Sequence, residues 1–223
     1  MSEVVPESYV RKIESTIRST GYEMSDRVRE AFQSIPRSLF VLPKDRKRAY
    51  YDQPLHILSG QTISAPSMYA LMISTDIGNP QPNMKVLEIG TGSGYGAALL
   101  AFVVGESNTY TIERHRDLVD FATNNLKNAG LTGINIIHDN GTENIPNIGF
   151  DRIFVTACGD RVPDIYFSHL NPGGRIVIPL VNDRGEQWIW KITKDENSQI
   201  KYQRKMQVIF VPLIYKEKLE EFI

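Results

Sequence analysis

The stretch "KVLEIGTGSGYGAA" (residues 85–98) carries the strongest indication of the fold. A short apolar run leads into three alternate glycines, Gly90, Gly92 and Gly94, and then into a run rich in alanine and leucine. This order predicts a buried strand, a glycine turn and the start of a helix. Glycines let the backbone approach a ligand closely, and the free N–H groups at a helix start face that ligand. The stretch therefore predicts a cofactor-binding turn.

Strands and helices alternate after this turn. Further strands are expected at 109–113, 134–138, 151–157 and 174–181, and helices at 94–104, 116–130 and 162–170. Such alternation predicts βαβ units and hence a parallel sheet covered on both faces. The end of the chain differs, because the strands expected at 187–193 and 206–213 have only a polar connector between them. This favours an antiparallel pair at one edge of a doubly wound, mostly parallel α/β sheet.

The first third of the chain carries helical patterns and one long irregular stretch. Helices are expected within residues 6–34 and at 67–77. Residues 44–66 are interpreted as a loop, and a loop of that length inside a compact domain usually has a function. We expect residues 1–78 to form an N-terminal helical layer with a substrate loop, and residues 79–223 to form the cofactor-binding core of the same compact domain.

The composition is that of a soluble globular chain. Of the 223 residues, 41% are hydrophobic and 23% are charged, and the formal net charge is −1. This charge gives no electrostatic basis for nucleic acid or an anionic membrane as partner. The single cysteine, Cys158, excludes an intramolecular disulfide, and the four histidines show no metal-ligand spacing. No signal sequence or bilayer-length apolar run is visible, so the expected compartment is the cytoplasm.

Two classes of cofactor use such a glycine turn. The letters "GSGYGA" (residues 92–97) fit the dinucleotide pattern G-x-G-x-x-G/A. That register begins four residues after Glu88, whereas a dinucleotide turn leaves its strand at the first glycine. Glu88 would also face a pyrophosphate with like charge, while it suits S-adenosylmethionine, which carries ammonium and sulfonium groups and no phosphate. The E-x-G-x-G-x-G arrangement resembles the first motif of class I, Rossmann-like methyltransferases.

Two later positions are expected at the same end of the sheet. Glu113 ends the next strand, where a carboxylate accepts both ribose hydroxyls of an adenosine cofactor. This fits both NAD and S-adenosylmethionine, and the alternative is that Glu113 only ends the strand and caps the following helix. Asn140 follows the third strand and is placed to offer its carbonyl oxygen to an adenine amino group. An Asn-Gly pair is, however, commonly just a turn.

The polar stretch "SGQTISAP" (residues 59–66) lies upstream of the glycine turn. It offers hydroxyl groups on Thr62 and Ser64 and an amide on Gln61, ahead of a helix that begins with proline. If the glycine turn holds a methyl donor, these groups are candidates to hold the acceptor at a near-attack separation of about 3–3.5 Å. The local alternative, which the neighbouring residues favour, is that Ser64 only caps the helix.

The chain resembles the protein-L-isoaspartate O-methyltransferase family from about Val28 to Lys218. The resemblance rests on the order and spacing of "AYYDQPLHILSGQTISAPSMYALM", "VLEIGTGSGYGAALLA", "FDRIFVTACGDRVPDIYFSHLNPGGRIVIPL" and "VIFVPLIYKEK". It implies methyl transfer from S-adenosylmethionine to the free α-carboxylate of isoaspartyl residues in proteins and peptides, with S-adenosylhomocysteine as product. The ester then closes to a succinimide, which reopens partly as normal aspartate. The implied partners include no nucleic acid and no membrane.

The resemblance also implies the site residues. It places Ser64, as the catalytic residue, where cofactor and substrate carboxylate meet. It implies a cofactor site formed by Gln61, Thr62, Ile63, Met68, Glu88, Gly90, Gly92, Gly94, Glu113, Arg114, Asn140 and Gly141, with no metal ion. A carboxylate is already ionised at neutral pH, so the reaction needs no general base. What remains is positioning and partial desolvation of the reactants, which hydroxyl and N–H groups supply.

Several positions depart from the family pattern. Asn140 stands where Asp is usual, His56 and Leu58 replace a Pro and a Gly of the substrate loop, and Ile214 replaces a common Thr. A methyltransferase for a small molecule or RNA is therefore an alternative, although the net charge disfavours RNA. An NAD-dependent oxidoreductase and a non-catalytic binding module are the others. The tail "YKEKLEEFI" is expected to form a short helix, and the chain to be a monomer or a homo-oligomer held through it.

Overall fold

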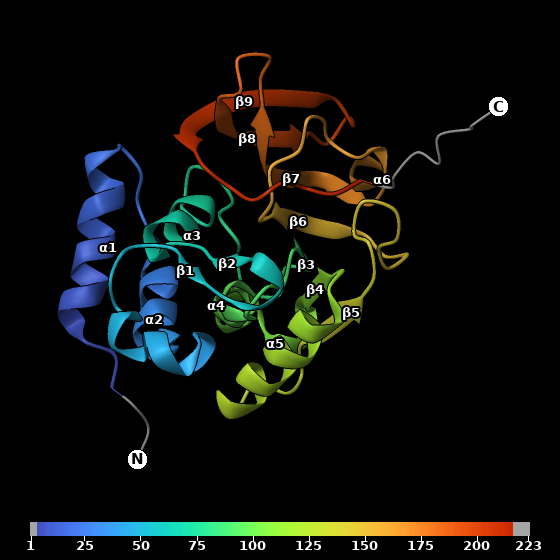
Figure 1. The fold of residues 1–223 in the computed structure, drawn as a ribbon. Coiled ribbons are helices and arrows are strands. Elements are labelled where there is room, and N and C mark those ends of the chain that lie inside the picture. Colours follow the sequence, from blue (N-terminus) through green and yellow to red (C-terminus); the bar gives the residue numbers. More distant parts are fainter. Residues whose placement is uncertain (1–3, 216–223) are drawn as a thin grey trace.

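The structure, a computed structural model, describes residues 4–215. Its centre is a seven-stranded sheet in the order β5-β4-β3-β6-β7-β8-β9, and β1 and β2 form a separate small sheet (Figure 1). The strands are β1 Leu55–His56, β2 Thr62–Ile63, β3 Val86–Ile89, β4 Thr109–Glu113, β5 Asn135–His138, β6 Phe150–Val155, β7 Leu170–Val181, β8 Gln187–Lys194 and β9 Ile200–Val208. The α-helices are α1 Glu7–Ser19, α2 Asp26–Ser34, α3 Pro66–Met72, α4 Tyr95–Val104, α5 Arg116–Asn128 and α6 Asp164–Ser168. The 3₁₀-helices are η1 Arg37–Phe40, η2 Pro43–Arg48, η3 Leu58–Gly60 and η4 Glu106–Asn108.

The strand order is that of a doubly wound sheet. From β3 at the centre the chain moves outward through β4 to β5, then crosses back to β6 on the other side of β3. Strands β3 to β7 are parallel, and β8 and β9 are antiparallel additions at one edge. The prediction of a mostly parallel sheet with an antiparallel edge pair is therefore confirmed. Reversal of the strand order at β3 places a ligand crevice at the carboxyl ends of the strands around it.

Several of the expected bounds are wrong; strand β7, for example, begins at Leu170 and not at residue 174. The last strand, β9, begins at Ile200 and ends at Val208, whereas the apolar run predicted residues 206–213. Its first half alternates poorly, because both faces of this edge strand meet solvent and carry polar side chains such as Lys201 and Gln203. The helix expected at 67–77 already ends at Met72.

Helices cover the two faces of the sheet unequally (Figure 1). On one face, Val86, Phe154 and Val177 share a hydrophobic core with residues of α1 to α5. On the other face, Leu87 and Ile153 lie in a second core that includes α6. The outer helices α1 and α2 pack on α3 and α4. The N-terminal helical layer is thus part of the same core, and the boundary at residue 78 stays a prediction.

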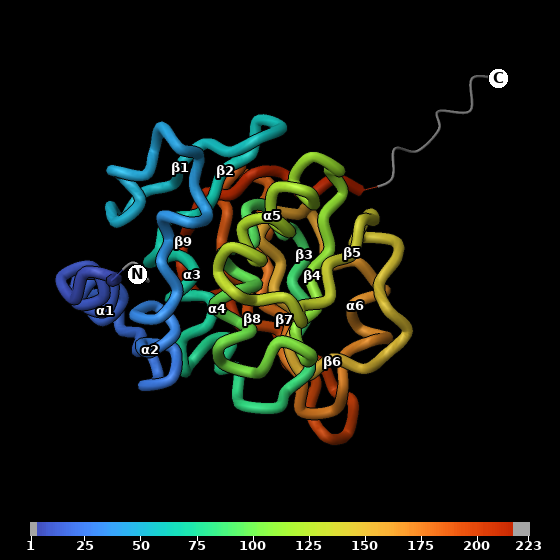
Figure 2. The backbone as a smooth tube through the Cα atoms, turned by 90° about the horizontal axis from the view of Figure 1, so that it is seen from below, coloured from blue at the N-terminus to red at the C-terminus, as the bar shows by residue number. Residues whose placement is uncertain are grey.

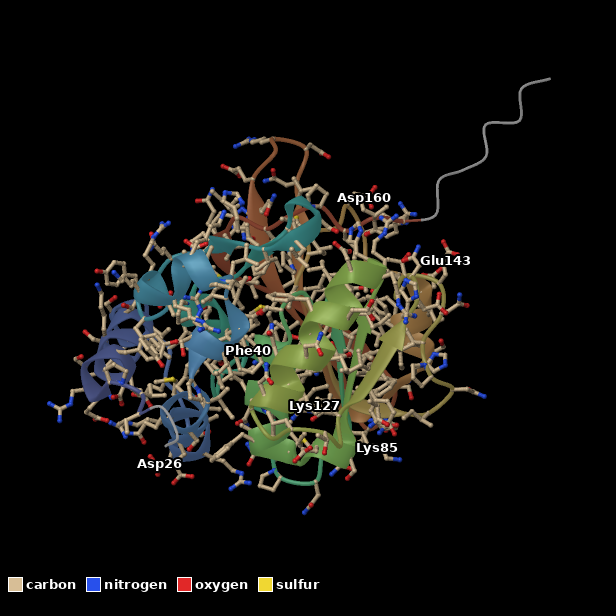
Figure 3. The ribbon with its side chains drawn as sticks, turned by 60° about the horizontal axis from the view of Figure 1, so that its bottom comes forward. Asp26, Phe40, Lys85, Lys127, Glu143 and Asp160 are labelled. Carbon is tan, nitrogen blue, oxygen red and sulfur yellow. The ribbon has the colours of Figure 1, made fainter. Side chains whose placement is uncertain are left out.

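The two ends of the parallel strands are marked by labelled side chains in Figure 3. Lys85, which precedes β3, and Lys127, in the last turn of α5, lie at the end where the strands begin. Glu143 and Asp160, which follow β5 and β6, lie at the opposite end. No helix within residues 4–215 is long and apolar enough to cross a membrane. The expected tail helix lies outside the described residues from residue 216 onward.

Candidate active site

A cavity of about 160 Å³ lies where the parallel strands end. Turns after β3, β4, β5 and β6 line it from the sheet, residues near β2 line it from the N-terminal layer, and residues 211–214 close it from the C-terminal side. The cavity is therefore assembled from segments that are far apart in the sequence and meet only in the folded chain. This is the position at which doubly wound sheets bind ligands.

Nine of the predicted site residues line this cavity. They are Gln61, Thr62, Ser64, Gly90, Gly92, Glu113, Arg114, Asn140 and Gly141. The other four lie around it: Ile63 is buried in the hydrophobic core, Met68 lines an adjoining groove, Glu88 is buried beside a second small pocket, and a side chain at Gly94 would press against α5. The role of each residue in binding stays a prediction.

The glycine turn after β3 requires glycine on steric grounds. Gly90 has φ +97°, in a region that L-residues rarely adopt. A Cβ added there would lie 2.4 Å from Thr156 Oγ1. That hydroxyl oxygen lies 2.8 Å from the carbonyl oxygen of Gly90 and 3.0 Å from that of Ile89. The end of β6 thus holds the turn in a fixed shape, with its backbone exposed to the cavity.

Glu113 joins the glycine turn to the turn after β4. Its Oε2 accepts a hydrogen bond from the N–H of Gly92 (3.0 Å), and its Oε1 accepts one from the N–H of His115 (3.0 Å). His115 is the N-cap residue of α5, so Glu113 contacts the start of this helix, although α5 has no side-chain cap of the usual kind. A carboxylate accepts about four hydrogen bonds. Glu113 therefore retains acceptor capacity for a ligand in the cavity.

Residues 55–63 form a small antiparallel hairpin, so the stretch predicted to be irregular is only partly so. Leu55 pairs with Ile63, and His56 pairs with Thr62. At its tip, Ser59 Oγ donates to Asp117 Oδ2 (2.6 Å), which ties the hairpin to α5. In Figure 2 the labels of β1, β2 and α5 lie close together on one side of the molecule.

Ser64 is not a helix cap, contrary to the local interpretation. Helix α3 begins at Pro66, its N-cap is Ala65, and no side chain caps it. Asp52 accepts a hydrogen bond from the N–H of Ser67 (2.9 Å) instead, and so satisfies a donor of the first turn from fifteen residues upstream. Ser64 therefore lines the cavity without a capping role, and its side chain is hydrogen-bonded with that of Tyr69.

The protein family described as protein-L-isoaspartate(D-aspartate) O-methyltransferase matches residues 9–218. The chain belongs to this family. It is 44% identical over 208 residues to the protein-L-isoaspartate O-methyltransferase of Methanopyrus kandleri, which covers 92% of this chain and 91% of that protein. It is 41% identical over 200 residues to the same enzyme of Thermococcus onnurineus, with 89% and 90% covered.

Solved structures agree with this assignment. A protein-L-isoaspartate O-methyltransferase from Plasmodium falciparum, in complex with S-adenosyl-L-homocysteine, is similar with a TM-score of 0.77 and 29% identity, over 92% of this chain and 97% of that chain. A second protein-L-isoaspartate O-methyltransferase gives a TM-score of 0.78 and 28% identity, over 91% and 65%. The class I methyltransferase fold is thus confirmed. The chain is an S-adenosylmethionine-dependent enzyme that methylates isoaspartyl residues, and the NAD-dependent and non-catalytic alternatives are wrong.

The acidic residue of the isoaspartate methyltransferase glycine motif is buried. Glu88 is 1% exposed, and its Oε2 accepts a hydrogen bond from Thr111 Oγ1 (2.7 Å). Burial, with a smaller contribution from the nearby Glu113, raises the pKa of this carboxyl to about 8, against the hydrogen bonds from Thr111 and the Ala97 backbone, which lower it. Glu88 shares a small pocket with Tyr69 and Thr156, which also line the main cavity. A positive charge in the cavity would favour the ionised form of Glu88.

The raised pKa of Glu88 predicts a pH dependence of stability in the ligand-free protein. The folded state holds this proton up to about pH 8, whereas the unfolded state releases it near the ordinary pKa of 4.5. The contribution of Glu88 to stability is therefore complete below pH 4.5 and is lost as the pH rises through 8. We expect Glu88→Gln to flatten this dependence in denaturant unfolding measured from pH 4.5 to 8. Glu30→Gln, at an exposed position, is the control, and identical pH slopes for Glu88→Gln and the unmodified protein would contradict the expectation.

The turn after β5 differs from its expected arrangement. Asn140 Oδ1 already accepts hydrogen bonds from the N–H (3.1 Å) and the hydroxyl (2.9 Å) of Thr142. Both of its lone pairs are therefore used within the turn. Asp139, which was not predicted from the sequence, also lines the cavity, and within residues 4–215 its Oδ1 accepts hydrogen bonds while its Oδ2 accepts none. The position of Asp139 directly after the third expected strand could have identified it from the sequence.

Two of the four departures from the family pattern, His56 and Leu58, lie outside the cavity, and Asn140 and Ile214 line it. His56 and Leu58 are both exposed. Ile214 lies in a segment held by two hydrogen bonds: the N–H of Cys158 donates to Val211 O, and the N–H of Leu213 donates to Cys158 O, both at 2.7 Å.

Burial raises the pKa of the Cys158 thiol to about 11, as befits a buried structural cysteine. No group of three metal-binding side chains occurs within residues 4–215.

Proposed function

We propose that Ser64 holds the free α-carboxylate of an L-isoaspartyl residue beside the methyl group to be transferred. One observation carries this proposal: Ser64 lines both the cavity and an adjoining groove of about 760 Å³. The groove also includes Met68 and Ile209, and its volume is several times that of the cavity. Ser64 thus stands where a cofactor in the cavity and a polypeptide in the groove would meet.

We further infer that the sheet side of the cavity holds the adenosyl part of the cofactor. Glu113 retains acceptor capacity for the ribose hydroxyls, and the backbone at Gly90 and Gly92 allows close approach. Asp139 Oδ2 is the acceptor that fits an adenine amino group better than Asn140, whose carbonyl oxygen is engaged by Thr142. These groups are acceptors, glycines and backbone donors, which suits an adenosyl ligand without phosphate.

The chain's residues then have a limited chemical task. When bound, S-adenosylmethionine supplies an activated methyl group. The acceptor carboxylate is ionised at neutral pH, so no side chain has to remove a proton. Thr62 and Ser64 supply hydroxyl donors that orient the carboxylate, and the cavity walls remove part of its water. Closure of the methyl ester to a succinimide, with loss of methanol, needs only the substrate's own backbone nitrogen.

Ser64→Ala tests the role of this residue. We expect kcat for an isoaspartyl peptide to fall on the order of 10–10²-fold, because the hydroxyl positions the reacting carboxylate. The Kd of S-adenosylhomocysteine should stay within about threefold, since the alanine variant keeps the backbone and the cofactor contacts of the sheet. Steady-state methyl transfer and isothermal titration calorimetry give the two values.

Ser67→Ala, in the first turn of α3, is the matched control, because Ser67 lines neither the cavity nor the groove. Its kinetics should equal those of the unmodified protein. An equal loss of activity and of cofactor affinity in Ser64→Ala would assign Ser64 a purely structural role, and unchanged kinetics would refute the proposal. The cytoplasmic location and a homo-oligomer through residues 216–223 stay predictions.

A further inference from the structure

Arg37 is a buried cation next to the proposed catalytic loop. It is 0% exposed and begins η1. Its guanidinium donates to four backbone carbonyls: Nη1 to Ala49 O (2.7 Å) and Tyr51 O (3.4 Å), and Nη2 to Gln53 O (3.1 Å) and Ser64 O (3.1 Å). One side chain thus joins the segment 49–53 to the residue whose hydroxyl lines the cavity.

Arg37 forms no ion pair among the described residues, although the Asp52 carboxylate is near enough to favour its charge. The Nε–H of Arg37 has no hydrogen-bond partner among the described residues. Removing a charge from water costs several kcal/mol, and here four carbonyl dipoles and the nearby Asp52 carboxylate offset part of that cost. Burying an arginine to hold a loop therefore carries a large desolvation cost.

The position of the Ser64 carbonyl explains what the arrangement achieves. The Ser64 peptide is held by Arg37 from one side, while the following helix α3 fixes Pro66 onward. The backbone position from which the Ser64 side chain extends is therefore fixed relative to the glycine turn. Displacement of a reacting group by about 1 Å costs roughly 10²-fold in rate. The guanidinium also bonds the carbonyl of the same residue whose hydroxyl would meet an anionic carboxylate.

We propose that Arg37 is a positioning residue of methyl transfer, which fixes the Ser64 backbone and thereby the hydroxyl that orients the substrate carboxylate. The inference rests on the proposed role of Ser64. The proposed role requires the two terminal nitrogens of the guanidinium and not only its charge. An ammonium group has three donors on one nitrogen, so it cannot reach all four carbonyls at once. Lysine at this position would keep the positive charge but could not hydrogen-bond the Ser64 carbonyl and those of the 49–53 segment together.

The chain offers a matched control in Arg152, at the start of β6. It is also buried, at 5% exposed, and its guanidinium donates to the backbone carbonyls of Gly78 (2.6 Å), Asn79 (3.5 Å) and Asp151 (2.6 Å). It lies near the end of the sheet marked by Lys85 in Figure 3, because the N–H of Arg152 approaches Lys85 O. Arg152 therefore fastens a loop in the same way, but far from the cavity.

The test compares Arg37→Lys, Arg37→Ala, Arg152→Lys and Ser64→Ala. For each variant, kcat and KM for an isoaspartyl peptide, the Kd of S-adenosylhomocysteine and the thermal unfolding midpoint are measured. We expect Arg37→Lys to lose on the order of 10-fold or more in kcat/KM for the peptide, with cofactor Kd within threefold. Arg152→Lys should lower the unfolding midpoint and leave kcat/KM of the folded fraction unchanged. Guanidinium ion at low millimolar concentration should restore part of the activity of Arg37→Ala but none to Ser64→Ala.

Several results would overturn the inference. A kcat/KM for Arg37→Lys within threefold of the unmodified protein would do so, as would a parallel loss of cofactor affinity or an equal loss of activity in Arg152→Lys. If Arg37→Ala does not fold, the lysine variant carries the test. If Ser64→Ala loses activity while Arg37→Lys keeps a normal kcat/KM, only the role of Arg37 is refuted. Normal activity of Ser64→Ala refutes the role of Ser64 itself.

Discussion

Gly90→Ala should abolish S-adenosylhomocysteine binding and lower the free energy of unfolding by about 3 kcal/mol. The φ of +97° is strained for alanine, and its methyl group would lie 2.4 Å from Thr156 Oγ1. Either the turn moves or Thr156 gives up its contacts with the carbonyls of Ile89 and Gly90. Both outcomes deform the backbone that lines the cavity. Calorimetric titration and denaturant unfolding measure the two effects.

Gly130→Ala is the matched control for this variant. Gly130 has φ +77°, but a Cβ added there meets no atom within 4 Å. The control should therefore lose only about 1 kcal/mol of stability, through backbone conformation, and should bind S-adenosylhomocysteine normally. The difference between the two variants isolates the clash with Thr156. Native cofactor affinity in Gly90→Ala would contradict the assignment of this turn to the cofactor.

Glu113→Ala should weaken S-adenosylhomocysteine binding on the order of 10²–10³-fold, because hydrogen bonds to a charged group contribute about 1.5–3 kcal/mol each. The variant removes the acceptor proposed for the ribose, and it also releases the N–H groups of Gly92 and His115. Glu113→Gln should show a smaller loss, since its amide oxygen still accepts one of these donors. Calorimetric titration of each variant gives the Kd.

Glu106→Ala is the control for Glu113. Glu106 also accepts a hydrogen bond from a backbone N–H, that of Gly133 (2.6 Å), but it precedes β4 and so lies at the opposite end of that strand. This variant should lose some stability and keep its cofactor affinity. An affinity within about threefold of the unmodified protein in Glu113→Ala would place the ribose elsewhere in the cavity.

The central part of the fold was predictable because its pattern is local. The run before Gly90 is apolar, the glycines alternate, and the following helix is apolar throughout, so strand, turn and helix each have their own signal. The expected strand at 109–113 coincides with β4. The polar first half of β9 was not predictable from alternation, because an edge strand with two solvated faces carries no hydrophobic period.

The site was only partly predictable from the ends of the strands, because Asp139 and Thr156 directly follow β5 and β6 and were still missed. Glu113 and Asn140 were found from their position after a strand, and both line the cavity. Tyr69 also lines it but was missed, since only the tertiary fold brings α3 to the glycine turn. The capping interpretation of Ser64 was wrong for the same reason, because Asp52, far upstream, satisfies the first turn of α3.

Methyl transfer from labelled S-adenosylmethionine to two peptides tests the central claim most directly. The peptides differ only in aspartate or isoaspartate at one position, and the Ser64→Ala variant is assayed beside the unmodified protein. We expect base-labile label on the isoaspartyl peptide alone, and a large loss of that label in the variant. Equal labelling of both peptides, or no labelling of either while S-adenosylhomocysteine still binds, would contradict this claim.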